Sequence, residues 1–128
     1  MTASARGPAL GVLELDSVAR GVVVADAALK RSPALLIAVR AVSAGKLLVM
    51  LEGGVAEVEE AMTAARLAAG PRLVDALELP AADAQVWPML PGMLDGSGWH
   101  SADVAVAIIE TSTVCAALAA ADAARKVA

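Results

Sequence analysis

The chain has 128 residues, the length of one ordinary domain or of one domain with part of another. Hydrophobic residues make up 59% of it and aromatic residues only 2%, so its apolar side chains are mainly Ala, Val and Leu. A small domain cannot easily bury so much apolar surface by itself, so part of this surface is expected to be buried by association with other chains. The net charge of −4 gives no electrostatic attraction to nucleic acid or to an anionic membrane, so neither is expected as a partner.

No stretch of the sequence reads as a membrane span or a signal peptide. Charged residues interrupt every apolar run before it reaches the roughly 20 residues that a span needs, and the first residues hold no long apolar core. The single cysteine, Cys115, allows no internal disulfide and fits a reducing compartment. These features predict a soluble, cytoplasmic protein that associates with itself.

The first predicted elements are a strand and a helix. Ala9–Leu15 is an apolar run typical of a buried strand. Ser17 is a suitable N-cap for the helix that follows, and Pro33 is expected to end that helix, because the residue before a proline avoids the helical region. The spacing predicts that the apolar face of this helix contains Val18, Val22, Ala25 and Leu29.

Two short apolar runs, Ala34–Val39 and Lys46–Leu51, follow as predicted interior strands. The loop Arg40–Gly45 between them predicts a hairpin turn in which Gly45 can take a positive φ.

A second helix and a last strand complete the predicted domain. Helical spacing over Val55–Ala69 predicts one apolar face, and Gly70-Pro71 is expected to end the helix. The members of that face are Val55, Val58, Met62, Ala65 and Ala69. Arg72–Leu79 predicts a strand, and Ala81–Leu90 a short helical turn. The order β-α-β-β-α-β predicts an α+β sandwich of the ferredoxin-like type over residues 9–90.

The beginning of the chain repeats near its end. Without a gap and 96 positions later, Glu14 corresponds to Glu110, Asp26 to Asp122 and Lys30 to Lys126. We therefore expect a linker at residues 91–103 and, over residues 104–128, a strand (Asp103–Glu110) and a helix (Thr113–Val127) that begin an incomplete second copy. The alternative is that the last helix is a natural ending, which packs on the first copy or exchanges into a neighbouring chain.

The motifs along this order resemble those of the bacterial microcompartment (BMC) shell domain. The run ALGVLELDSVARGVVVADAALK is followed by VSAGK between two apolar strands and by EGGVAEVEEAMTAARLAAG. The matching positions are Glu14, Ala25, Asp26, Ala27, Lys30, Ser43, Gly45, Gly54 and Val55. The resemblance covers Ala9 to about Leu90, and the opening motif returns at Val106–Val127. The chain thus resembles a tandem-domain BMC shell protein that is truncated in its second domain.

This resemblance implies a structural, non-catalytic protein in the shell of a cytoplasmic bacterial microcompartment. Tandem members form homotrimers that mimic hexamers, called pseudohexamers, and tile with other shell proteins. The resemblance also implies that Val42, Ser43, Ala44 and Gly45 line a central pore for small metabolites, and that Lys30 lies at the edge between tiles. No metal or cofactor is expected, because the loop lacks the Cys with which some tandem members hold an iron–sulfur cluster. The basic residue and His that many relatives carry after the last strand are replaced here by Ala81-Ala82-Asp83, which puts one edge contact in doubt.

Several of these residues also have a simpler interpretation. Ser43 and Gly45 suit an ordinary hairpin turn, and Lys30 suits a helix ion pair with Asp26 four residues earlier. Glu14 and Glu110 are interpreted as either partnered buried carboxylates or exposed ones.

Three further residues could serve a site but have simpler expected roles. Cys115 is expected to be a small buried hydrophobe, His100 a surface residue without metal-ligand spacing, and Trp87 an anchor at an interface or in the core.

No catalytic class is favoured by the sequence. It has no phosphate-binding Gly-Lys-Ser/Thr loop, no dinucleotide fingerprint and no histidine outside the linker to serve as a preorganised base. The ferredoxin-like fold leaves a second class open, a regulatory module that binds a small ligand at a subunit interface, which is an argument from analogy alone. The apolar strands, Ala-rich helices and short loop of small residues favour the tiling shell protein.

Overall fold

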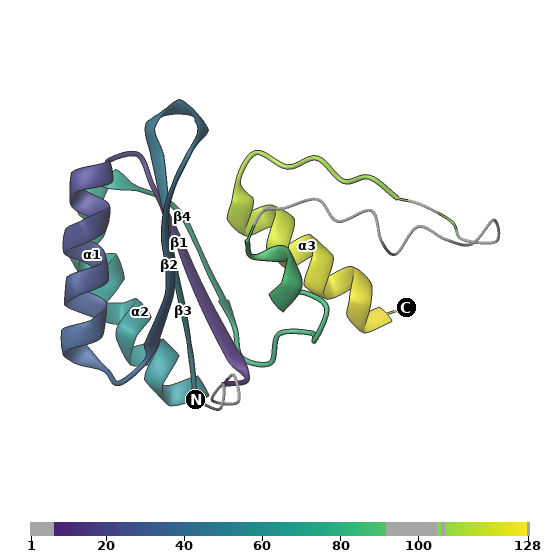
Figure 1. Ribbon diagram of the computed structural model, residues 1–128, viewed down its shortest axis with the longest axis horizontal. Helices are drawn as coiled ribbons and strands as arrows, with labels where there is room; N and C mark the ends of the chain where they lie inside the picture. The colour runs from purple at the N-terminus through teal and green to yellow at the C-terminus, as the bar shows by residue number, and fades with distance from the viewer. Residues whose placement is uncertain (1–6, 92–104, 106, 128) are drawn as a thin grey trace.

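The computed structural model describes residues 7–91, 105 and 107–127 (Figure 1). Its strands are β1 (Ala9–Leu15), β2 (Leu35–Val42), β3 (Lys46–Gly53) and β4 (Leu73–Leu79), and its α-helices are α1 (Val18–Arg31), α2 (Val55–Ala69) and α3 (Val114–Val127). Short 3-10 turns lie at Ser43–Gly45, Gly70–Arg72 and Trp87–Met89. From β1 to β4 the order is β-α-β-β-α-β, as the sequence predicted.

The four strands form one antiparallel sheet in the order β2-β3-β1-β4. The helices α1 and α2 cover one face of this sheet, and α3 lies on the opposite face (Figure 1). This arrangement confirms the α+β, ferredoxin-like prediction for the domain.

The alternation of side chains along the two central strands creates two separate cores. Leu13 of β1 and Val49 of β3 belong to the cluster under α1 and α2, whereas Val12 and Met50 belong to the cluster under α3. Every residue of β1 is buried, because both faces of the sheet are covered at this strand. Glu14 lies two positions after Val12 and so shares the face that α3 covers.

The ends of α1 agree with the prediction, but its buried face does not. The Ser17 side chain accepts a hydrogen bond from the Arg20 amide, and the helix ends at Arg31 before the extended Ser32. The buried residues are Gly21, Val24, Ala25 and Ala28. The predicted face was wrong in its other members, since Val18, Val22 and Leu29 are exposed.

The reason for this error is close packing. A side chain at Gly21 would overlap that of Leu47 in β3, so α1 approaches the sheet along its smallest residues. Apolar residues occupy both sides of the helix, and periodicity alone does not show which side is buried.

The remaining elements follow the predictions with small shifts. Four predicted members of the α2 face are buried, whereas Val55 is exposed. Gly70 ends α2 with φ +54°, a conformation that L-residues rarely adopt. Strand β2 extends to Val42, so its turn is shorter than predicted because Arg40 and Ala41 pair with β3.

The helix predicted near the end of the chain is present as α3, but the strand predicted before it is absent from the described residues. Residues 107–110 take no regular conformation, and Asp103, Val104 and Val106 lie outside the described part of the chain. A strand requires a neighbour for its backbone groups, and residues 107–110 pair with none of the four strands.

Replacing Gly70 tests the backbone conformation that ends α2. We expect Gly70→Ala to lower the free energy of unfolding by about 1–3 kcal/mol, since no atom blocks the added methyl and the cost is purely conformational. Gly54→Ala is the matched control, because Gly54 has φ −65° and is expected to lose less than about 1 kcal/mol. Urea unfolding measures both, and equal losses would contradict the interpretation.

Candidate functional site

The predicted loop is a tight, exposed turn at one end of the sheet. Ser43, Ala44 and Gly45 join β2 to β3, and the hairpin projects beyond the neighbouring strands (Figure 1). Ala44 and Gly45 both have positive φ, +62° and +72°, which confirms the prediction for Gly45. The turn exposes its backbone and a single hydroxyl, with no charged or bulky side chain.

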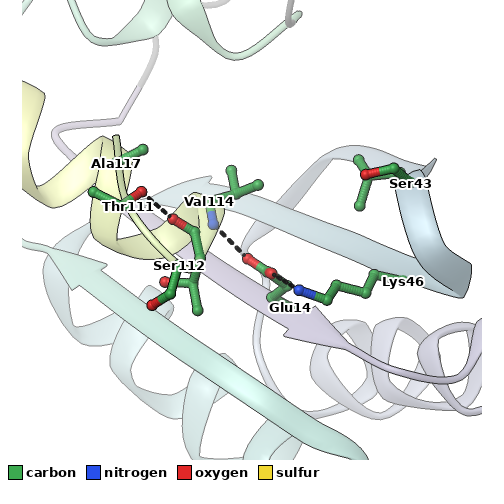
Figure 2. A pocket seen from close by; sticks show the side chains of 9 residues that line it. Glu14, Ser43, Lys46, Thr111, Ser112, Val114 and Ala117 are labelled. Atoms are coloured by element: carbon green, nitrogen blue, oxygen red, sulfur yellow. Dashed lines mark hydrogen bonds and ion pairs between the residues drawn. The ribbon is translucent and has the colours of Figure 1, made fainter. Parts of the chain in front are cut away.

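A pocket of about 280 Å³ adjoins this turn. Val42, Ser43 and Lys46 line its hairpin side, and hydroxyl-bearing residues line the side toward α3 (Figure 2). The hydroxyl-bearing residues on that side are Thr111, Ser112 and Thr113. The loop and the beginning of α3, far apart in the sequence, therefore share one pocket.

Glu14 forms the floor of this pocket and connects its two sides. Its side chain is only 1% exposed. One carboxylate oxygen, Oε1, accepts a hydrogen bond of 2.8 Å from the Val114 amide, and the other, Oε2, lies 3.3 Å from Lys46 Nζ (Figure 2). A carboxylate is favourable at a helix N-terminus, where the backbone amides lack intrahelical partners.

The two glutamates of the repeat therefore differ. Glu14 is the partnered buried carboxylate that the sequence left open, and Glu110 is exposed. Both oxygens of Glu14 have a partner within the domain, so this carboxylate connects the hairpin side of the pocket to the start of α3.

Three aspartates also contribute contacts between α3 and the rest of the domain, and their roles were not predicted from the sequence. Thr113 Oγ1 donates a hydrogen bond of 2.6 Å to Asp75 Oδ2 in β4. The Asp83 amide donates one of 2.8 Å to Asp122 Oδ1, and the Asp83 carboxylate lies 3.4 Å from Arg125 Nε.

The electrostatics of Asp83 follow from these contacts. The amide of Gln85 and then the guanidinium of Arg125 lower the pKa of the Asp83 carboxyl. Asp83 belongs to the segment after Pro80 that departs from the family pattern. That departure was the one feature of the sequence that pointed to a special role for Asp83.

Lys30 lies in the last turn of α1. The helix α1 ends at the opposite end of the sheet from the hairpin turn (Figure 1). The Nζ of Lys30 is 2.7 Å from Asp26 Oδ2, and both side chains are exposed, so the local ion pair is confirmed. The structure does not bring Lys30 together with the loop residues.

Cys115 packs in the core between α3 and the sheet, as predicted. It is 2% exposed, and its Sγ lies 3.8 Å from the Val12 carbonyl oxygen. Burial, followed by the nearby carboxylates of Asp75 and Glu14, raises the pKa of the thiol to about 12. The thiol therefore remains protonated at neutral pH.

Of the two other candidates, the described residues include only Trp87. Trp87 is half-buried and packs against the cluster under α3, whereas His100 lies outside the described residues. Within the described ranges, no group of His, Cys, Asp and Glu could hold a metal ion, and no helix is long and apolar enough to cross a membrane.

The domain formed by β1 to β4 belongs to a known family. A model of the BMC domain matches residues 9–82, more than half of the chain, and the chain belongs to this family. It is 41% identical over 120 residues to the bacterial microcompartment shell protein PduT of Citrobacter freundii. Its fold is similar to the crystal structure of a microcompartments protein from Desulfitobacterium hafniense DCB, with a TM-score of 0.71 and 28% sequence identity.

Both relatives are longer than this chain. The alignment with the Citrobacter protein covers 92% of this chain and 62% of the relative, and that with the Desulfitobacterium protein covers 94% and 64%. The chain therefore spans less than two thirds of either protein.

Glu14 can be tested against its exposed counterpart. We expect Glu14→Ala to lower the free energy of unfolding by about 1–3 kcal/mol, because the Val114 amide and Lys46 lose a buried partner. Hydrogen exchange in α3 should accelerate more than in α2. Glu110→Ala is the control and should change stability by less than about 0.5 kcal/mol; equal effects of the two substitutions would contradict the assigned role.

The reactivity of Cys115 provides a separate test of α3 docking. We expect the native thiol to react with a maleimide or an aromatic disulfide at pH 8 at least about a hundredfold more slowly than the urea-unfolded chain, since burial and the raised pKa both suppress the thiolate. A Cys115→Ala/Ala123→Cys variant, with its thiol on the exposed side of α3, should react rapidly in both states. Rapid labelling of native Cys115 would show that α3 is not docked.

Proposed function

We propose that this protein is a structural component of a bacterial microcompartment shell, located inside the cell, and that it is not an enzyme. The observation that carries the proposal is the match to the BMC domain over residues 9–82, in a fold with an exposed turn of small residues at one end. Relatives named as microcompartment shell and microcompartments proteins support it.

A shell role requires association with other subunits, and the surface supports this. Large apolar side chains are exposed on the outer side of α1 and along the edge strand β2. They are Val18, Val22, Val23, Leu29, Leu35, Leu36 and Val39. We propose that these faces are buried in a homotrimeric pseudohexamer, which tiles with other shell proteins.

The turn is proposed to face the central axis of that assembly and to line a pore for small metabolites. Ser43, Ala44 and Gly45 would let several turns approach one another, and Ser43 with the exposed amides would offer polar contacts. Lys30 is proposed to lie at the tile edge, and its place at the opposite end of the sheet supports this division between axis and rim (Figure 1).

Residues 104–128 are proposed to begin a second BMC domain. The gapless repeat at an offset of 96 residues and the greater length of both relatives support this. Reading the coding DNA beyond Ala128 tests it, with a second strand–turn–strand and helix as the expected result.

A crosslinking experiment tests the axial position of the turn. In a Cys115→Ala background, we expect Ser43→Cys to be converted by a short bismaleimide into covalent multimers, because turns around one axis lie close together. Leu67→Cys is the matched control, since Leu67 is exposed on α2 at a different position, and it should stay monomeric on a denaturing gel. Electron microscopy of the uncrosslinked protein with its second domain complete should show discs; the absence of both discs and multimers from that protein would overturn the shell proposal.

A further inference from the structure

A lysine directly follows the turn between β2 and β3, and the turn itself carries no charge. Ser43, Ala44 and Gly45 have no ionisable side chain, and Lys46 is the next residue. Since the ammonium of a lysine sits at the end of a flexible stem, several positions around its Cα are within its reach. The position of this ammonium therefore determines whether the end of the hairpin is charged.

The Lys46 ammonium lies beside Glu14 and not at the turn. The side chain extends toward the Glu14 carboxylate rather than toward Ser43 (Figure 2). Its Nζ is 3.3 Å from Glu14 Oε2, in a pair whose side chains are 31% and 1% exposed. The charge of Lys46 is thus neutralised behind the turn by a carboxylate that solvent hardly reaches.

Glu14 cannot move outward with the lysine, because its own position is fixed. It belongs to the central strand β1, where it pairs with Leu48 of β3 and Asp75 of β4. Its other oxygen, Oε1, accepts the 2.8 Å hydrogen bond from the Val114 amide. A buried carboxylate that loses its cation is left uncompensated, which costs far more than the loss of an exposed ion pair. Glu14 therefore keeps Lys46 in the pocket.

The cross-strand row of Glu14 contains two further ionisable side chains. Asp75, its neighbour in β4, accepts hydrogen bonds from a backbone amide and from the Thr113 hydroxyl. Arg40, in the edge strand β2, is further from the turn in the chain than Lys46 is. Lys46 is thus the cation whose position sets the charge at the turn.

We propose that Glu14 is a specificity-determining residue of the pore, because it holds the Lys46 charge behind the turn. The pore lining then consists of the Ser43 hydroxyl and backbone groups, which suit small uncharged polar solutes better than anions. This inference rests on the proposed shell function and names its class of solute. Without Glu14, the Lys46 ammonium would reach the turn of every subunit, and the ring of positive charge would concentrate anions at the axis.

The retention of Lys46 can be measured by lysine acetylation in the full chain. Glu14→Gln keeps an oxygen for the Val114 amide and removes the charge that holds the lysine. We expect acetic anhydride to modify Lys46 at least about threefold faster in this variant. Asp26→Asn is the matched control, because it removes the charge beside Lys30 in an exposed pair and should change the rate at Lys30 by less than about twofold. Mass spectrometry measures both lysines, and circular dichroism checks the fold.

Ion permeability tests the consequence for the pore, in the assembled protein with its second domain complete. In a planar bilayer under a potassium chloride gradient, we expect Glu14→Gln to raise the permeability of chloride relative to potassium by about threefold or more. Adding Lys46→Gln should restore the original ratio, whereas adding Arg40→Gln should leave the raised ratio in place.

Lys46→Gln alone tests the same point without a substitution at Glu14. It should leave the permeability ratio unchanged, since the native lysine does not face the axis. A fall in chloride permeability would show that Lys46 already lines the pore and would overturn the inference.

The outcomes separate the inference from the proposed function. Equal acetylation of Lys46 with and without Glu14, or a permeability ratio that Glu14→Gln does not change, overturns the inference and leaves the shell role intact. The absence of both discs and conductance from the unmodified two-domain protein would instead overturn the proposed function.

Discussion

The sheet of this protein must be covered on both faces, and the rest of the structure depends on this constraint. Strands β1 and β3 lie in the middle of the sheet and bury apolar side chains on each side. The helices α1 and α2 cover one face with small residues in close contact. The other face is covered by α3 and the segment around Val86 and Leu90. Without α3, the apolar residues beside Val12 and a buried carboxylate would be open to water, an arrangement that costs free energy.

The repeat shows how one amphipathic pattern serves two environments. In α1, the small residues Gly21 and Ala25 pack inward and the Asp26–Lys30 pair stays in solvent. In α3, the equivalent pair lies partly under the domain, with Asp122 buried and bonded to the backbone at Asp83. Identical residues thus act as solvated surface in one copy and as a contact in the other, because the neighbours differ.

Much of the fold was predictable because it follows from local chemistry. Ser17 caps α1, Gly70 ends α2 and Gly45 takes a positive φ, each for a reason carried by the residue itself. The buried side of α1 was not predictable, because both sides of the helix are apolar. The close approach of Gly21 to Leu47 determines which side faces the sheet. The strand before α3 was predicted because its sequence repeats that of β1, but its described residues 107–110 meet no strand that accepts their hydrogen bonds.

The candidate site was also predictable only in part. The turn at Ser43 could be located from the sequence, because a short run of small residues between two apolar strands identifies a hairpin. The pocket beside it could not, since it depends on Thr111 and Ser112, which the fold brings to the turn from far along the chain. The role of Glu14 was left open for the same reason: its partner is an amide at residue 114, and no local pattern shows such a contact.

The position of Trp87 gives the protein an internal optical label. The chain contains two Trp and no Tyr or Phe. Trp87 packs in the cluster beneath α3, whereas the described residues of the cluster beneath α1 and α2 include no aromatic side chain. The polarity around this indole changes when α3 docks or leaves. The fluorescence of Trp87 therefore reports on α3 and not on the core under α1 and α2. With Trp99 replaced, ultraviolet emission would follow one layer of the sandwich alone, in real time and without an attached dye.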